Sequence, residues 1–320
     1  MKTNIDRRTF LTTAVTGLFP SWLIQEDKPP LDARFNYDIS AYSHTDPALL
    51  HYAETSHFPT GFREPKCLAV TGSSILVGGD RALKMYDTDG QLQTTLELPA
   101  LPHAVAGLGV GRLAVAFQDH IQLFGPAPTV GESLGSRAHL TGITQLGDRL
   151  FLADAGNREV VQCDLTGKVL SRIKGFVVPS PYFDIRAGAD GLLWVANPGK
   201  HRLEGYTPAG HLELSWGETG MDIANFCGCC NPVYFTRMPD GRFVTSEKGL
   251  NRIKIYTATG KFSGVVAGVE HLVKDLELAK QACANCHIGF GFPIACDAAN
   301  RILALDPATR NVRIFTPKAA

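Results

Sequence analysis

Five of the eight cysteines in this chain lie in two short stretches. The first has the sequence CGCCNP over residues 227–232, and the second has the sequence CANCH over residues 283–287. Closely spaced cysteines in turns can direct several sulfurs at a single metal ion or cluster. The sequence therefore gives five candidate ligands of one shared centre: Cys227, Cys229, Cys230, Cys283 and Cys286.

Several kinds of centre fit these thiols. A [4Fe–4S] cluster is normally held by four cysteines, so five candidates for four positions favour this cofactor first. Zinc in a site of four cysteines is the next alternative. Disulfides are a third, for instance a bond between the two stretches together with a vicinal Cys229–Cys230 bond. The CANCH stretch also matches the attachment signature of haem c, with His287 as iron ligand, but haem leaves the other three thiols unexplained.

The remaining cysteines have a simpler interpretation. Cys67, Cys163 and Cys296 lie in apolar runs, where an unmodified cysteine packs as a small hydrophobic residue. By contrast, Gly228 and Pro232 bracket the first cluster, and a turn-rich loop of this kind is expected to present its thiols outward.

The elements that position these loops follow from an internal repeat. From Leu68 to Pro317 the chain repeats an apolar run, a Gly/Asp/Asn turn, a second run, a polar turn and a third run. The third runs close at Tyr86, Phe124, Cys163, Tyr206, Tyr256 and Phe315. A period of roughly 40 residues with about four short strands is typical of one propeller blade. The sequence thus predicts an all-β, six-bladed propeller with four antiparallel strands per blade; a parallel β-helix or a β-sandwich does not explain six such units.

Two of the units carry a family resemblance. Residues 148–167, DRLFLADAGNREVVQCDLTG, and residues 240–260, DGRFVTSEKGLNRIKIYTATG, resemble NHL-type repeats. This resemblance implies the propeller fold and no particular activity, because propellers serve as binding modules, scaffolds and hydrolases. The chain as a whole resembles exported NHL-like propellers that carry a CGCC loop.

The N-terminal segment has the features of an export signal. Arg7 and Arg8, followed by Phe10 and Leu11, resemble the twin-arginine signal of bacterial secretion. This resemblance implies the twin-arginine translocase as a partner, export in the folded state and a periplasmic location, with the leader either removed or kept as an anchor. We expect three segments: the signal in 1–30, a lead-in with a ring-closing strand in 31–66, and the propeller in 67–320.

The predicted fold brings the two cysteine stretches together. Each precedes the first run of a unit, so each links the outer strand of one blade to the inner strand of the next. Such links lie on one face beside the channel, and neighbouring blades are close enough for both loops to reach one centre.

These features favour an iron–sulfur protein that transfers or senses electrons with a periplasmic or membrane redox partner. The alternative is a binding or assembly propeller with structural zinc or disulfides. With 31 basic and 31 acidic residues, the charge gives no reason to expect nucleic-acid binding.

The sequence leaves enzymatic activity undecided, since no Ser–His–Asp or paired-carboxylate constellation can be singled out. Four polar residues near strand ends are interpreted as turn formers: Asp184, Asn225, Glu247 and Asp306. The basic residues of 248–252, KGLNR, are expected to be solvated.

Overall fold

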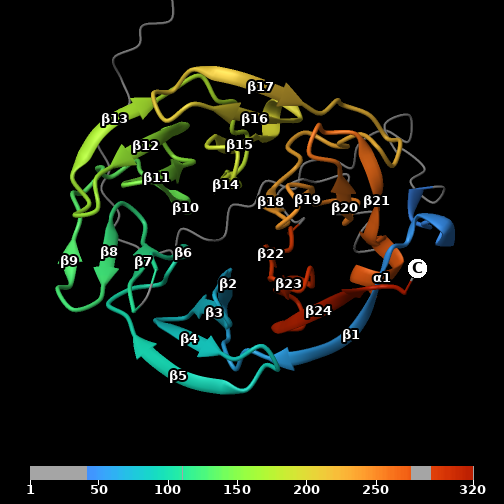
Figure 1. The fold of residues 1–320 in the computed structure, drawn as a ribbon, viewed down its shortest axis with the longest axis horizontal. Coiled ribbons are helices and arrows are strands. Elements are labelled where there is room, and N and C mark those ends of the chain that lie inside the picture. The colour runs from blue at the N-terminus through green and yellow to red at the C-terminus, as the bar shows by residue number, and fades with distance from the viewer. Residues whose placement is uncertain (1–41, 110, 275–289, 320) are drawn as a thin grey trace, which may run out of the picture. The chain divides into compact units, whose positions relative to one another are not determined.

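The computed structural model describes residues 42–109, 111–274 and 290–319. All of these belong to one of the two compact units of the chain, Asp38–Ala320. In the described part of this unit, six four-stranded antiparallel sheets stand around a central axis (Figure 1). The predicted six-bladed, all-β propeller is therefore confirmed.

The first three blades follow the chain in order, each from its inner to its outer strand. Blade 1 contains β2 (Pro65–Thr71), β3 (Ser74–Gly79), β4 (Ala82–Tyr86) and β5 (Leu92–Glu97). Blade 2 contains β6 (Ala104–Gly107), β7 (Leu113–Ala116), β8 (Ile121–Phe124) and β9 (Thr129–Val130). Blade 3 contains β10 (Leu140–Leu146), β11 (Arg149–Asp154), β12 (Glu159–Cys163) and β13 (Val169–Ile173).

The last three blades complete the ring. Blade 4 contains β14 (Ile185–Ala187), β15 (Leu193–Asn197), β16 (Arg202–Tyr206) and β17 (Leu212–Trp216). Blade 5 contains β18 (Tyr234–Arg237), β19 (Phe243–Ser246), β20 (Ile253–Tyr256) and β21 (Phe262–Ala267). Blade 6 contains β22 (Ile294–Cys296), β23 (Ile302–Asp306), β24 (Asn311–Pro317) and, outermost, β1 (Tyr52–Pro59).

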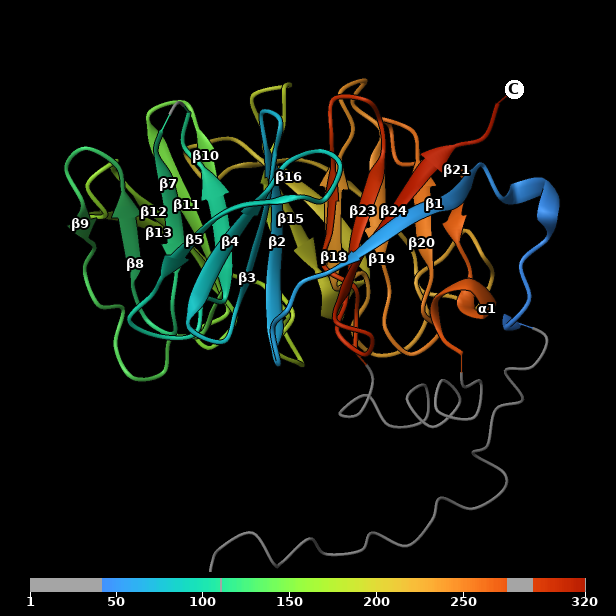
Figure 2. The same ribbon diagram turned by 90° about the horizontal axis from the view of Figure 1, so that it is seen from below.

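The outer strand of blade 6 comes from the segment that precedes the repeats. Strand β1 pairs antiparallel with β24, from Tyr52 opposite Pro317 to Pro59 opposite Asn311. Figure 2 shows these two strands side by side although they come from opposite ends of the described chain. This pairing closes the ring with backbone hydrogen bonds and leaves no three-stranded blade.

Among the described residues from 47 onward, helical structure is confined to three short segments. These are η3 (Pro47–Leu49), η4 (Pro198–Lys200) and α1 (Val269–Leu272). No helix in the described ranges is long and apolar enough to span a membrane.

The closing residues of the sequence repeat form the core between blades. All six lie in the third strand of their blade, and all except Phe124 are buried. Between blades 4 and 5, for example, the closing residue Tyr256 packs against Trp216 of β17 with ring centroids 4.8 Å apart. Burying an aromatic side chain of this size contributes about 2–3 kcal/mol, so the closing position stabilises the blade interfaces at which it is aromatic and buried.

A glycine lies four residues after four of the six closing residues, at Gly90, Gly167, Gly210 and Gly260, and it has a packing role as well as a turn role. In blade 5, Gly260 has φ +82° and lies flat against Trp216 of blade 4. A Cβ atom there would be 2.3 Å from Cγ of that indole. The Thr-Gly turns seen in the sequence thus allow the close approach of successive blades.

One position at the end of the second strand anchors the link that enters the blade. In blade 3, Asp154 accepts a hydrogen bond from the His139 amide at 2.9 Å. In blade 4, Asn197 accepts one from the Val177 amide at 2.9 Å. In blade 5, Glu247 accepts one from the Cys227 amide at 3.2 Å. These three strand-end residues are therefore anchors of the preceding link, and blade 5 uses its anchor to hold the first cysteine loop.

Candidate thiolate site

The first cysteine cluster lies in residues 217–233, the link between β17 and β18. The link enters blade 5 where its inner strand begins. The second cluster, with Cys283, Cys286 and His287, lies outside the described residues, as do Arg7 and Arg8 of the expected export signal. The structure can therefore be compared with the predicted centre only at Cys227, Cys229 and Cys230.

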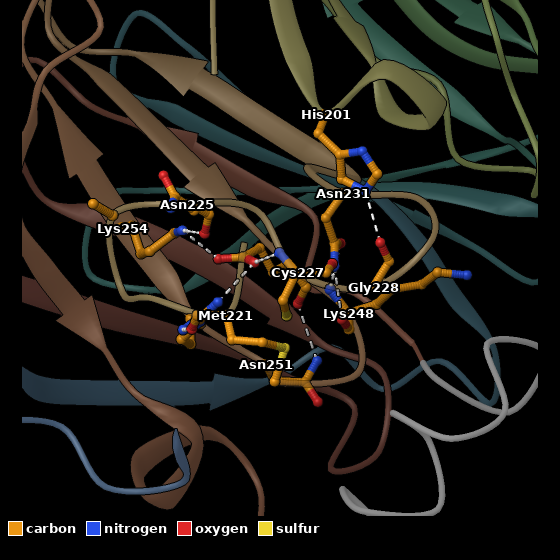
Figure 3. A network of polar contacts seen from close by, with 12 residues as sticks. His201, Met221, Asn225, Cys227, Gly228, Asn231, Lys248, Asn251 and Lys254 are labelled. Carbon is orange, nitrogen blue, oxygen red and sulfur yellow. Dashed lines mark hydrogen bonds and ion pairs between the residues drawn. The ribbon is translucent and has the colours of Figure 1, made fainter. Parts of the chain in front are cut away.

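The cysteine loop is fixed by side chains from two blades (Figure 3). The Asn231 amide donates to the carbonyl oxygens of Cys227 at 2.6 Å and Lys248 at 3.0 Å. Its oxygen accepts from the Lys248 backbone N–H at 2.9 Å. From blade 4, His201 donates through Nε2 to the Gly228 carbonyl at 2.7 Å. Each side of the turn is thus tied to a neighbouring rigid element.

The three thiols differ in exposure. Cys227 and Cys230 retain only 2 % and 1 % of their accessible surface, whereas Cys229 is exposed. The expectation that the loop presents its thiols outward is wrong for two of the three, because the anchors at Glu247 and Asn231 draw the loop into the blade. The sulfurs of Cys229 and Cys230 lie 3.2 Å apart.

A buried cluster of charges lies beneath the loop. Glu247 is fully buried and contacts Nη2 of Arg252 at 3.1 Å and Nζ of Lys254 at 2.6 Å. Lys254 also donates to the Asn225 carbonyl at 2.7 Å, and the Tyr256 hydroxyl donates to the Ala224 carbonyl at 3.0 Å. We call Glu247, Arg252 and Lys254 the ion cluster.

Burial of the ion cluster corrects two sequence-based expectations. The basic residues of 248–252 are not solvated, since Lys248 and Arg252 are 4 % and 1 % exposed. Glu247 does more than form a turn, because it holds both the cysteine link and two cations. A buried carboxylate of this kind requires partners, and here the partners come from the next strand.

The charges of the cluster depend on one another. Burial alone would raise the pKa of Glu247, but Arg252 and Lys254 together lower it. Burial lowers the pKa of Lys254 to about 8, with Glu247 opposing this shift and Arg252 adding to it. Burial also acts against the charge of Arg252, but Glu247 and then the nearby Cys227 sulfur raise its pKa.

The ion cluster carries more positive than negative charge. One carboxylate faces two cations, so their sum is one positive charge when all three are ionised. Moreover, Nε of Arg252 is buried and has no hydrogen-bond acceptor among the described residues. The site therefore suits an additional anionic group beside Cys227, and a thiolate or a thiolate-bound cluster is such a group.

A period-two signal in the sequence points to this cluster. Arg252, directly before strand β20, and Lys254 and Tyr256 within it alternate with Ile253 and Ile255. Both faces of a propeller blade are buried, so charged residues on one of them require a buried partner. His201 gave no comparable signal, because nothing local in the sequence indicates that it reaches the loop of the next blade.

Cys67 and Cys163 are separate from this site. Cys163 fills the closing position of blade 3 and Cys67 lies in the inner strand of blade 1, both buried. Burial raises the pKa of each of these two thiols to about 12. Within residues 42–109, 111–274 and 290–319, no three His, Cys, Asp or Glu side chains are grouped so as to hold a metal ion.

Comparison with known proteins supports the fold. No family model matches the chain, and no curated protein matches it. A streptogramin B lyase structure superposes with a TM-score of 0.58 at 12 % identity, over 85 % of this chain and 100 % of that one. A catalytically inactive virginiamycin B lyase from Staphylococcus aureus with quinupristin superposes with a TM-score of 0.58 at 14 % identity, over 82 % of this chain and 83 % of that one.

A third structure has a similar level of likeness. A protein of unknown function from Bacteroides thetaiotaomicron gives a TM-score of 0.57 at 12 % identity, over 87 % of this chain and 74 % of that one. At such identities the likeness concerns the path of the backbone. The chain is a six-bladed β-propeller similar in fold to the virginiamycin B lyase type.

Proposed function

We propose that the protein is an exported iron–sulfur propeller that transfers or senses electrons. The observation that carries this proposal is the position of the buried Cys227 beside an ion cluster with excess positive charge, in which Arg252 Nε has no acceptor among the described residues. Thiolate-bound iron–sulfur clusters are anionic and soft, and neighbouring cations stabilise them. When bound, such a cluster would supply reversible one-electron transfer.

The proposed ligand set contains four thiolates. In a [4Fe–4S] cluster each thiolate binds its own iron, and the 3.2 Å spacing of the Cys229 and Cys230 sulfurs is shorter than that of two such ligands, so one of the two is proposed as a ligand. Cys227 and one of Cys229 and Cys230 therefore supply two ligands. Cys283 and Cys286 supply the other two in this proposal, and the sequence places Cys286 four residues before Phe290.

A pair of hydrogen bonds connects the ion cluster to the chain that follows the second cysteine stretch. The Asn251 amide donates to the Glu247 carbonyl at 3.2 Å and to the Phe290 carbonyl at 2.7 Å. Asn251 thereby joins the ion cluster to the first described residue after the second cysteine stretch. In the proposed protein, Glu247 positions the Cys227 backbone while Arg252 and Lys254 balance the charge of the thiolates.

A second candidate is a non-redox binding or assembly propeller with structural zinc. Two thiolates on one tetrahedral zinc, at about 2.3 Å from the metal, lie about 3.8 Å apart. The Cys229–Cys230 spacing of 3.2 Å is close to this value, and it favours both sulfurs on one ion. Zinc would then contribute to the stability of the loop and would not change oxidation state.

Metal analysis after purification without oxygen separates the two candidates. Iron with acid-labile sulfide and a brown colour supports the iron–sulfur protein; colourless protein with zinc supports the second candidate. Cys227→Ser and Cys283→Ser should each lose the same metal, whereas the matched control Cys163→Ser should retain it. Full metal content in both of the first two variants would contradict the shared centre.

The proposal places the protein in the periplasm, where its partner is a periplasmic or membrane redox protein. Export through the twin-arginine translocase requires the guanidinium groups of Arg7 and Arg8, which lysine does not reproduce. Replacing both by lysine should abolish periplasmic accumulation, measured by cell fractionation with an unrelated secreted protein as control. Unchanged export of this variant would contradict the route and leave the metal site unaffected.

A further inference from the structure

The central channel is bordered by the free edges of six strands. Each inner strand lies at one end of its sheet and pairs on one side only: β2, β6, β10, β14, β18 and β22. Figure 1 shows these strands around the axis. Unpaired backbone N–H and C=O groups of an edge strand are available to a ligand. The channel wall is therefore polar even where its side chains are small.

Two cavities in this channel meet at Arg186. One has a volume of about 30 Å³ and the other about 220 Å³. Four residues line both of them: Leu68, Val105, Ile143 and Arg186. The larger cavity would hold roughly seven waters at about 30 Å³ each, which is enough room for a small organic molecule.

The Arg186 guanidinium is only partly used by the protein. Its Nη1 contacts the Asp184 carboxylate at 2.5 Å and the Ile185 carbonyl at 2.7 Å. No acceptor among the described residues is hydrogen-bonded to Nε or Nη2. A guanidinium presents five N–H donors in a planar fork that suits a carboxylate. The remaining donors are available to a ligand in the cavities that Arg186 lines.

The other charged groups of the channel favour an anion. Asp184 is the one carboxylate in the lining of the two cavities. Its oxygens already accept hydrogen bonds from the Ile185 and Phe235 amides and from Arg186. Lys66 and His103 line the smaller cavity, and so does Tyr234, whose phenol is an additional donor. A small acid entering the channel would meet several donors and no uncompensated negative charge.

We propose that the channel binds a small organic acid, with its carboxylate on the free side of Arg186 and its carbon chain in the larger cavity. The walls of that cavity suit a short chain, since they include Ala69, Ala106, Gly107 and Ala295. Thr144 and Gln145 provide further polar contacts. This ligand site is independent of the thiolate centre, which is in the link before β18.

Calorimetric titration of the full chain with succinate, pyruvate and inorganic phosphate tests this proposal. Saturable binding of a carboxylate supports it, and Arg186→Gln should weaken that binding at least about tenfold. Because that variant leaves Asp184 unpaired, the double variant Asp184→Asn/Arg186→Gln restores the charge balance and should also fail to bind. Arg202→Gln, an exposed arginine in the same blade, should bind as the unaltered protein does.

Three results would overturn the proposal. The first is the absence of saturable binding of either carboxylate to the unaltered protein at millimolar concentration. The second is unchanged carboxylate affinity in the double variant, provided that its thermal unfolding remains cooperative. The third is binding of phosphate alone, which would assign the channel to a different class of anion.

Discussion

Blades 3 and 5 use the same position for different purposes. Asp154 and Glu247 both end the second strand of their blade, both are fully buried, and both hold the backbone of the incoming link. In blade 3 the remaining partners of Asp154 are the backbone and side-chain nitrogens of Asn157. In blade 5 the partners of Glu247 are two cations from the third strand.

This difference shows which features of blade 5 are not required to form a blade of this propeller. Blade 3 anchors its link with neutral donors, and Val161 takes the place that Lys254 has in blade 5. A propeller blade of this protein thus closes without buried cations. Because buried charges are costly, the ion cluster beneath the cysteine loop indicates a local role beyond stability.

The largest effect is expected when the lysine of blade 5 is transplanted. Val161→Lys would place an ammonium group among Leu152, Ile121 and other apolar residues of blades 2 and 3. The expected loss is about 5 kcal/mol of unfolding free energy, because the buried charge has no partner. Urea unfolding measures it, with Val161→Met as control. A loss below about 1 kcal/mol would show that blade 3 accommodates the charge.

Neutralising the anchor of blade 5 should have the next largest effect. Glu247→Gln leaves Arg252 and Lys254 buried without their counter-charge, so we expect a loss of about 3–5 kcal/mol. Asp154→Asn in blade 3 should lose only about 1–2 kcal/mol, since its partners are neutral donors. Urea unfolding of both variants tests the difference. Equal losses would contradict the distinction between the two anchors.

A smaller effect concerns the thiol of blade 3 at alkaline pH. Burial raises the pKa of Cys163 to about 12, above the ordinary thiol value of the unfolded chain. Its contribution to stability is therefore present below about pH 9 and is lost as the pH rises toward 12, at no more than about 1.4 kcal/mol per pH unit. From pH 8.5 to 10.5, the unfolding free energy of the Cys163→Val variant should therefore fall less steeply than that of the unaltered protein. Urea unfolding at a series of pH values measures this.

The smallest effect concerns the link that Asp154 anchors. Burial lowers the pKa of His139, and the Asp154 charge only partly opposes this shift. The contribution of this imidazole to stability is present above the unfolded value of about 6.5 and is lost as the pH falls. His139→Gln should therefore reduce the acid sensitivity of unfolding between pH 6.5 and 5 by less than about 1 kcal/mol. Identical acid profiles would contradict the assigned shift.

The propeller was predictable from the sequence because each repeat unit shows the same local pattern of apolar runs and turn residues. The closing residues, such as Tyr206 and Tyr256, recur with turn glycines, and each unit signals the same four strands. The site was less predictable, because burial depends on contacts between units. Nothing near Cys227 in the chain indicates that Glu247 draws it inward, or that His201 of the preceding blade holds Gly228.

The closing pair of strands also sets an order of assembly. Residues 52–59 are synthesised long before their partners at 311–317, and Arg313 reaches Glu54 at 3.1 Å across most of the described sequence. Non-local pairing of this kind is slow, because a long loop must close before the contact forms. The early strand must therefore remain unpaired, and exposed to wrong partners, until residues 311–317 have been made. A chain without β24 would leave β1 without its partner and the ring open.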